Sequence, residues 1–324
     1  MSTVDLYNLN PILQVMGAGL AMALLPLSWW VWRHRQAPAG RRLQALTILT
    51  LFLTFDLILF GAFTRLTDSG LGCPDWPGCY GSATPVGAQL HIEAAQSAMP
   101  TGPVTHGKAW VEMVHRYLAT GVGVLILSLA VMTWRQRRRD PAQAVHPWWP
   151  TFTLLWVCLQ GAFGALTVTM KLFPAIVSMH LLGGMLLLAL LTVQAVRQRH
   201  SPWSQERRAL PTGVYVLLGV STLFLLLQIV LGAWVSSNYA VMACDTYPMC
   251  QGSWWPEMNF DKAFEWWRPL GMDAQGGNLP FQALTAIHFV HRWHAVLVVV
   301  LLALKTLELR ARRDAFVVFF LGFF

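Results

Sequence analysis

The segment EMVHRYLA, residues 112–119, lies in apolar surroundings yet contains Glu112, His115 and Arg116. Ionisable side chains are costly inside a membrane, so such residues indicate function by default. An imidazole can bind a metal ion or a haem iron. A carboxylate three residues earlier lies on nearly the same helix face and can take or give a proton there. A simpler alternative is that Glu112 forms an ion pair with Arg116 or Lys108.

A second segment, HFVHRWHA at residues 288–295, repeats the Val-His-Arg-aromatic pattern and contributes His291 and Arg292. The position equivalent to the glutamate is occupied by His288. The two segments therefore differ at the one position whose side chain would take part in proton transfer. This difference predicts a catalytic site in the first segment and a fixed cofactor site in the second. His288 and His294 flank His291 at three residues on either side and are alternative ligands.

The depths of three histidines predict a haem site. His115 and His180 lie five and six residues into helices that enter from outside, about 7–9 Å below the membrane boundary; His291 enters at a similar depth. Two imidazoles facing each other at one level suit the axial positions of a haem iron, whereas zinc requires more ligands. An interhelical hydrogen bond is the alternative for each single histidine. Gly183 and Gly184, which follow His180, would admit a flat macrocycle or allow close helix packing.

The arginines that follow two of these histidines are candidates for contacts to haem carboxylates. Arg116 and Arg292 each come one residue after a histidine, about 100° around the helix. A guanidinium at that place would contact a haem propionate through charge-assisted hydrogen bonds. The alternative is an ion pair with a carboxylate in the membrane, for which Asp56 is the candidate.

Membrane helices must position these residues, because the composition excludes an ordinary soluble domain. The chain has 324 residues, of which 55% are hydrophobic and only 12% charged, about half the charged fraction of a soluble protein. Apolar runs of about 18 or more residues can cross a bilayer as helices. The predicted fold class is an all-α polytopic membrane bundle. The expected spans are 11–32, 45–64, 110–134, 150–169, 174–196, 213–235 and 284–304. An eighth run starts near 315 and stops at Phe324 after about ten residues, too few to span a bilayer. We therefore expect either a truncated chain or an incomplete last helix.

The formal net charge of +8 reflects membrane topology and not nucleic-acid binding. Basic clusters follow the first, third, fifth and seventh spans, as the positive-inside rule predicts for cytoplasmic loops. We therefore expect a periplasmic N-terminus in a bacterial cytoplasmic membrane. The arginine-rich loops and the lack of a transit-like N-terminus argue against a mitochondrial inner membrane. The opening segment has no signal-peptide cleavage pattern, so we expect the first span to be retained.

Four of the five cysteines lie in the two long outer loops that this topology predicts. They form the pairs Cys73 and Cys79 in CPDWPGC, and Cys244 and Cys250 in CDTYPMC. Cysteine pairs on the non-cytoplasmic side indicate disulfides; free thiols or a redox-active pair are the alternative. A metal site would more typically use the CxxC spacing and further ligands.

The two cysteine loops align with each other, which indicates an internal duplication. Their glycine, alanine, cysteine and proline residues recur at a constant offset, and the Val-His-Arg segments follow at nearly the same offset. Two four-helix halves related by duplication explain this pattern. The expected domains are an extra N-terminal helix with its basic loop (1–44), an N-terminal half (45–210) and a C-terminal half (211–324).

Four stretches carry a resemblance to a known family: GAFTRLTDSGLGCPDWPGCYG, EMVHRYLA, SMHLLGG and HFVHRWHA. Together they resemble haem A synthases of the bacterial and mitochondrial CtaA/Cox15 family, from about residue 45 to the end. The resemblance implies a membrane oxidoreductase that oxidises the C8 methyl group of haem O. Successive hydroxylations, through the alcohol haem I, would produce the formyl group of haem A for cytochrome c oxidase.

The resemblance also assigns roles to individual residues. His115 and His180 would be the ligands of the substrate haem in the N-terminal half, with Glu112 as the catalytic residue. His291 would be the first ligand of a haem b cofactor in the C-terminal half. The second ligand is expected beyond Phe324, unless another histidine or another chain replaces it. The cysteine pair of the first outer loop would be associated with activity.

The expected partners are haem O, the haem O synthase, an electron donor that the sequence does not identify, and the lipid bilayer; a homo-oligomer is left open. Two other functions fit part of the pattern. One is a bis-histidine b-type cytochrome that exchanges electrons with quinol, and the other is a haem carrier without chemistry. The contrast between Glu112 and His288 argues against the cytochrome, because a pure electron carrier needs no carboxylate in one half.

Overall fold

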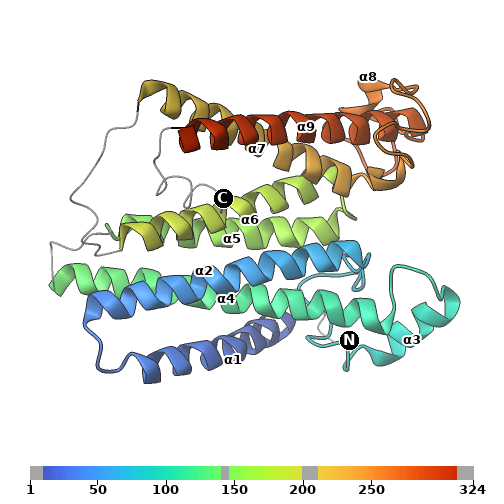
Figure 1. Cartoon of the computed structure of the whole chain (residues 1–324). Coiled ribbons are helices and arrows are strands. Elements are labelled where there is room, and N and C mark those ends of the chain that lie inside the picture. Colours follow the sequence, from blue (N-terminus) through green and yellow to red (C-terminus); the bar gives the residue numbers. More distant parts are fainter. Residues whose placement is uncertain (1–9, 140–145, 199–210, 312–324) are drawn as a thin grey trace. The chain divides into compact units, whose positions relative to one another are not determined.

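The computed structural model describes residues 10–139, 146–198 and 211–311 (Figure 1). Within these ranges the chain is all-α, with isolated bridges and no sheet. In chain order the elements are α1 (Asn10–Arg33), α2 (Ala39–Leu66), α3 (Gln89–Ala98), α4 (His106–Arg139), α5 (Trp148–Thr169), α6 (Pro174–Arg197), α7 (Thr212–Ser237), the 3-10 turn η2 (Ala240–Met242), α8 (Phe260–Ala263) and α9 (Phe281–Ala311).

Seven of these helices are long and apolar enough to cross a membrane, namely α1, α2, α4, α5, α6, α7 and α9. They coincide with the seven complete spans expected from the sequence, so the prediction of an all-α, multi-pass membrane protein is confirmed. The eighth run, near residue 315, lies outside the described residues. Helices α4 and α9 begin earlier than their apolar runs, at His106 and Phe281. Their added turns carry Ala109 and Ala283, both of which are buried in the cores beneath the outer loops.

The N-terminal unit comprises Met1–Leu172 and Met179–His200, and α4 is its central helix (Figure 1). Helix α4 packs against α1, α2 and α5. At the loop end of the unit, a buried core joins α1 to the first cysteine loop and to α4. Its members include Val15, Cys73, Cys79, Met113 and Tyr117. Helix α1, expected only as an extra span, is therefore part of the core beneath the first cysteine loop.

The C-terminal unit comprises Phe173–Ser178 and Ser201–Phe324. Within it α7 packs against α9, and η2 and α8 cover the loop end. Its buried core is concentrated at that end and includes Trp234, Ala240, Ala263, Ala283 and Ile287. Further along α7, large apolar side chains such as Leu223 and Leu226 are exposed, as expected of a helix that hydrocarbon can solvate. The loop packing therefore holds α7 and α9 together at one end.

Candidate functional site

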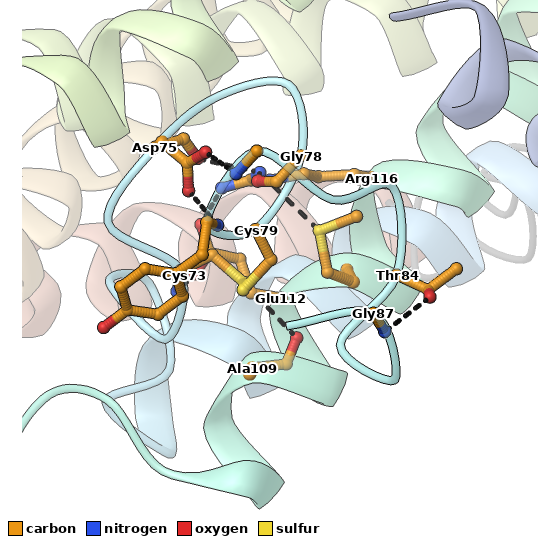
Figure 2. Close-up of a disulfide and its surroundings, with 12 residues drawn as sticks. Cys73, Asp75, Gly78, Cys79, Thr84, Gly87, Ala109, Glu112 and Arg116 are labelled. Carbon is orange, nitrogen blue, oxygen red and sulfur yellow. Dashed lines mark hydrogen bonds and ion pairs between the residues drawn. A yellow bond between two sulfur atoms is a disulfide. The ribbon is translucent and has the colours of Figure 1, made fainter. Parts of the chain in front are cut away.

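The first cysteine loop is a compact turn closed by the Cys73–Cys79 disulfide (Figure 2). The Asp75 carboxylate accepts the backbone N–H groups of Tyr80 and Gly81, at 2.6 and 2.7 Å. Tyr80 and Gly81 have φ angles of +48° and +70°. This left-handed backbone conformation is rare for residues other than glycine. The disulfide and the Asp75 carboxylate together hold the turn in this conformation.

Glu112 is a buried carboxylate on α4, with 4% of its surface exposed. Its Oε2 accepts the backbone N–H of Cys73 at 2.7 Å, and its Oε1 forms an ion pair with Arg116. Figure 2 shows Glu112 beneath the loop, next to Cys73. Of the two cations considered from the sequence, Arg116 is the partner, whereas Lys108 Nζ lies 3.2 Å from Asp68 Oδ2. A carboxylate held at both oxygens is a preorganised group for proton transfer.

Arg116 ties the loop to α4. Its Nη1 donates to the carbonyl oxygens of Asp75 and Pro77, each at 3.1 Å, and also to the carbonyl of Gly78. Its Nη2 faces Glu112. Because these donors are already used within the protein, a haem propionate would have to share or displace one of them. The contact between Arg116 and a propionate therefore stays a prediction.

The imidazoles of His115 and His180 lie close enough to interact electrostatically. Each one packs against a glycine of a neighbouring helix. A Cβ added at Gly61 would lie 3.1 Å from His115 Cε1, and a Cβ added at Gly164 would lie 3.4 Å from His180 Cε1. The ring of Phe60 stacks on His115, with centroids 6.2 Å apart and planes 8° apart. Glycines and an aromatic ring thus set the orientation of the histidine pair.

The imidazoles of this pair have few polar contacts with the rest of the protein. The Nδ1 atoms of His115 and His180 are buried without a hydrogen-bond partner in the part of the chain that the structure describes. Buried polar atoms are nearly always satisfied in folded proteins. Across the same described ranges, no group of three or more His, Cys, Asp or Glu side chains could hold a metal ion. Two imidazoles from two helices fit the axial ligand set of a haem iron.

The C-terminal unit builds the same kind of loop with a histidine in place of the glutamate. The Cys244–Cys250 disulfide closes the loop. The backbone N–H of Cys244 lies 3.2 Å from His288 Nδ1, and Arg292 Nη1 donates to the Met249 carbonyl at 2.9 Å. Both disulfides expected from the cysteine spacing are therefore present, and each loop is bonded to the helix that carries a candidate ligand.

His291 is positioned like His115, but its ring is already engaged. A Cβ added at Gly232 would lie 3.1 Å from His291 Cε1. The Nε2 of Gln228 lies 3.0 Å from His291 Nδ1 and 3.4 Å from His291 Nε2, while its Oε1 lies 2.7 Å from His294 Nδ1. To bind an iron atom through His291, the protein would have to move this amide away from one ring nitrogen.

Sequence reasoning restricted to ionisable side chains misses two amides in the membrane spans, of which Gln160 is buried and Gln228 is half-buried. Gln160 on α5 lies against Gly183, three residues after His180. Gln228 on α7 contacts His291 and His294 on α9. The signal that could have found them is a glutamine inside an apolar run, as in LLWVCLQG and LLLQIVLG. An amide in hydrocarbon needs a partner for the same reason that a charge does.

Comparison with known proteins identifies similar chains. The COX15-CtaA family, described as cytochrome oxidase assembly protein, matches residues 44–323. A haem A synthase of Shewanella oneidensis is 40% identical over 266 residues, which cover 81% of this chain and 77% of the relative. Haem A synthases of Rhizorhabdus wittichii and Erythrobacter litoralis are 25% and 28% identical, and each match covers 80% of this chain and 75% or 77% of the relative.

Proposed function

This chain belongs to the COX15-CtaA family of cytochrome oxidase assembly proteins, and from that premise we propose how its residues perform the chemistry. It is a membrane oxidoreductase with haem A synthase function. In the proposed reaction, the N-terminal unit holds haem O between His115 and His180. The C8 methyl group is oxidised by successive hydroxylations, through haem I, to the formyl group of haem A, which serves cytochrome c oxidase.

The observation that carries this proposal is the fixed carboxylate of Glu112 next to the histidine pair. Glu112 precedes His115 by three residues on α4, about 4.5 Å along the helix axis. The Cys73 N–H and Arg116 hold its two oxygens, so the carboxylate does not have to reorganise during the reaction. Its proposed role is to take or give the proton that hydroxylation of the neighbouring methyl group requires.

The orientation of the substrate supports this role. In haem O the C8 methyl group is next to a propionate, and charged propionates avoid the hydrocarbon interior. The propionate edge therefore faces the outer loops. Glu112 lies on the loop side of His115, beneath the first cysteine loop. The methyl group that reacts and the carboxylate are thus expected on the same side of the iron.

We propose that the C-terminal unit holds haem b through His291, with a propionate near Arg292. The packing of His291 on Gly232 supports this proposal because it repeats the packing of His115 on Gly61. Bound there, haem b would supply electron transfer. A second histidine that would hold this haem is expected outside the described residues.

The proposed architecture is a duplication, with halves 45–210 and 211–324 and an extra helix in 1–44. Equivalent positions in the two cysteine loops support it. Tyr80 and Gln251 both have positive φ, at +48° and +53°, and each is followed by a glycine of positive φ. Equivalent backbone conformations at equivalent positions are expected when one loop was copied from the other.

We place the protein in a bacterial cytoplasmic membrane, with the N-terminus and both cysteine loops on the periplasmic side. The bacterial relatives and the two disulfides support this placement, because disulfides persist in the periplasm and not in the cytoplasm. The proposed partners are haem O and the haem O synthase that supplies it.

Pigment analysis tests the proposed function. The full chain is produced together with a source of haem O, and the extracted haems are separated and weighed by mass spectrometry. Haem I and haem A are expected with the unaltered chain and with His288→Ala, the matched variant of the second half. Glu112→Ala is expected to bind haem O and to form neither product. Normal product from Glu112→Ala would refute the role of this carboxylate.

The same measurement distinguishes the alternative of a b-type cytochrome. Such a protein would retain haem b, accept electrons from quinol and leave the mass of haem O unchanged. The different residues at positions 112 and 288 favour the synthase, because electron transfer alone does not need a buried carboxylate in one unit.

A further inference from the structure

Gln160 is a buried amide whose hydrogen-bonding capacity is unused. It lies on α5 with 6% of its surface exposed, and neither its Nε2 nor its Oε1 has a partner among the described residues. An unpaired buried polar group destabilises the protein, and water does not readily reach one in a bilayer. An amide in this state is suited to a ligand that brings both a donor and an acceptor.

The position of the amide is set by a glycine. A Cβ added at Gly183 on α6 would lie 1.9 Å from Gln160 Nε2, so the amide rests directly on the backbone of α6. Gly183 follows His180 by three residues, and Gly164, one turn after Gln160, packs against the same imidazole. Gln160 therefore lies next to the histidine pair and about 5 Å further from the outer loops than His180.

Other intramembrane glutamines of this chain are used differently. Gln228 contacts His291 and His294, and Gln194 Nε2 donates to Thr47 Oγ1 at 3.1 Å. Among the described residues, Gln194 Oε1 and both side-chain amide atoms of Gln198 also lack a partner, but both residues lie at the far end of α6 from His180. Within the described spans, Gln160 thus combines depth, a lack of partners and a place beside the substrate ligands.

This inference rests on the proposed function and deepens it by one feature of the substrate. Haem O differs from haem B at one edge, where a hydroxyethylfarnesyl chain replaces a vinyl group. Its hydroxyl can both donate and accept a hydrogen bond, as can a primary amide. The hydroxyl lies on the edge opposite the propionates. With the propionates toward the outer loops, that edge is at the depth of Gln160, whereas the reacting methyl is on the side of Glu112.

We propose that Gln160 binds the hydroxyl of the hydroxyethylfarnesyl group and thereby selects haem O over haem B. A site built to hydrogen-bond a substrate hydroxyl discriminates against an analogue without it, because the buried polar group is then left unpaired. A purely apolar pocket would recognise the farnesyl chain but not the hydroxyl. Gly183 is part of this proposed binding site, because the absence of a side chain there leaves the space that the Gln160 amide occupies.

The test is a pair of absorbance titrations with haem O and haem B. The full chain carries His291→Ala, so that binding at the C-terminal unit does not contribute to the signal. Gln160→Met, which keeps the shape and removes the amide, is expected to lower haem O affinity about 5- to 20-fold, the effect of one or two hydrogen bonds. The affinity for haem B is expected to change less than about twofold, because haem B has no hydroxyl and so makes no hydrogen bond to Gln160 that the substitution could remove. Gln194→Met is the matched control and should leave the ratio of the two affinities unchanged.

A second variant covers the case in which Gln160→Met does not fold. Gly183→Ala keeps the amide but displaces it, and should lower the preference for haem O in the same direction. Equal losses for both haems, or no loss, would overturn the proposal. If the unaltered chain binds haem O without a bis-imidazole spectrum, the proposed function itself fails. If the chain binds and oxidises haem O while the ratio is unchanged in Gln160→Met, only the role of Gln160 fails.

Discussion

The two cysteine loops hold different side chains by the same backbone contact. In the N-terminal unit the N–H of Cys73 reaches Glu112, and in the C-terminal unit the N–H of Cys244 reaches His288. In both units an arginine one turn further along the helix bonds to carbonyl oxygens of the loop. The scaffold is thus common to both units, and the group that it presents has changed from a carboxylate to an imidazole.

A second difference lies beside the histidines that we propose as ligands. His291 is contacted by Gln228, which also holds His294. At the equivalent positions the N-terminal unit has Leu57 and Leu118, and Nδ1 of the corresponding imidazole has no hydrogen-bond partner in the described part of the chain. One loop scaffold thus presents a carboxylate beside an imidazole whose Nδ1 lacks a described partner in one unit, and hydrogen-bonded imidazoles in the other.

The largest expected effect comes from exchanging the two presented groups. Glu112→His is expected to lower haem A formation about 100-fold or more, because the carboxylate to which we assign proton transfer is replaced by an imidazole of different charge and shape. His288→Glu should change the rate only a few-fold. Mass spectrometry of extracted haems measures both. A similar loss in the two variants would mean that the loops do not differ in function.

Removal of the first disulfide should have the next largest effect. In the double variant Cys73→Ser and Cys79→Ser, the rate of haem O oxidation is expected to fall roughly tenfold, because the shell that fixes Glu112 is loosened. A disulfide that closes a loop this short stabilises the folded state by about 2 kcal/mol, because it lowers the chain entropy of the unfolded state. Cys244→Ser with Cys250→Ser should reduce the oxidation rate less while it loosens the C-terminal unit. The opposite ranking would contradict a positioning role for the first loop.

A smaller effect is expected from crowding the histidines. A Cβ at Gly61 or Gly232 would lie 3.1 Å from the Cε1 of His115 or His291, closer than an ordinary contact, so each ring must shift slightly. Gly61→Ala should weaken haem O binding about three- to tenfold, as a small misplacement in a packed site does. Gly232→Ala should shift the haem b spectrum instead. Gly123, with nothing within 4 Å of an added Cβ, is the control and should tolerate alanine.

The smallest effect is a dependence on pH confined to the second outer loop. Lys262 Nζ lies 3.1 Å from both Glu265 Oε1 and Asp273 Oδ2. The Ala274 N–H and Lys262 hold the pKa of Glu265 below its usual range, and Lys262 lowers the pKa of Asp273. Because folded-state acid pKa values are lowered, this stabilisation is complete above the unfolded values near pH 4 and is lost as pH falls through the folded values.

The same ion pairs raise the pKa of Lys262. Its contribution is therefore complete below the unfolded value near pH 10.5 and is lost as pH rises through the folded value. Hydrogen exchange of the peptide 260–277, corrected for the intrinsic rate at each pH, measures the acid side. Faster exchange below about pH 4 is expected for this peptide. Unchanged protection would show that the ion pairs do not hold the loop.

The membrane spans and the residue types of the site could be predicted from particular segments. The seven complete apolar runs match seven helices, because a segment in hydrocarbon must satisfy its own backbone hydrogen bonds. The cysteine pairs and the closeness of His115 and His180 also follow from topology and depth. The starts of α4 and α9 do not, because buried alanines under the loops, and not apolar runs, continue those helices outward.

The membrane spans, the pairing of the cysteines and the closeness of His115 and His180 could be predicted from the sequence alone, since hydropathy and charge act locally along the chain. The hydrogen-bond partners depend on tertiary packing. Glu112 accepts the N–H of Cys73, Arg116 donates to loop carbonyls, and the side-chain amide of Gln160 has no partner among the described residues. These outcomes depend on residues far apart in sequence that meet at hydrogen-bonding distance, and no local pattern encodes those distances.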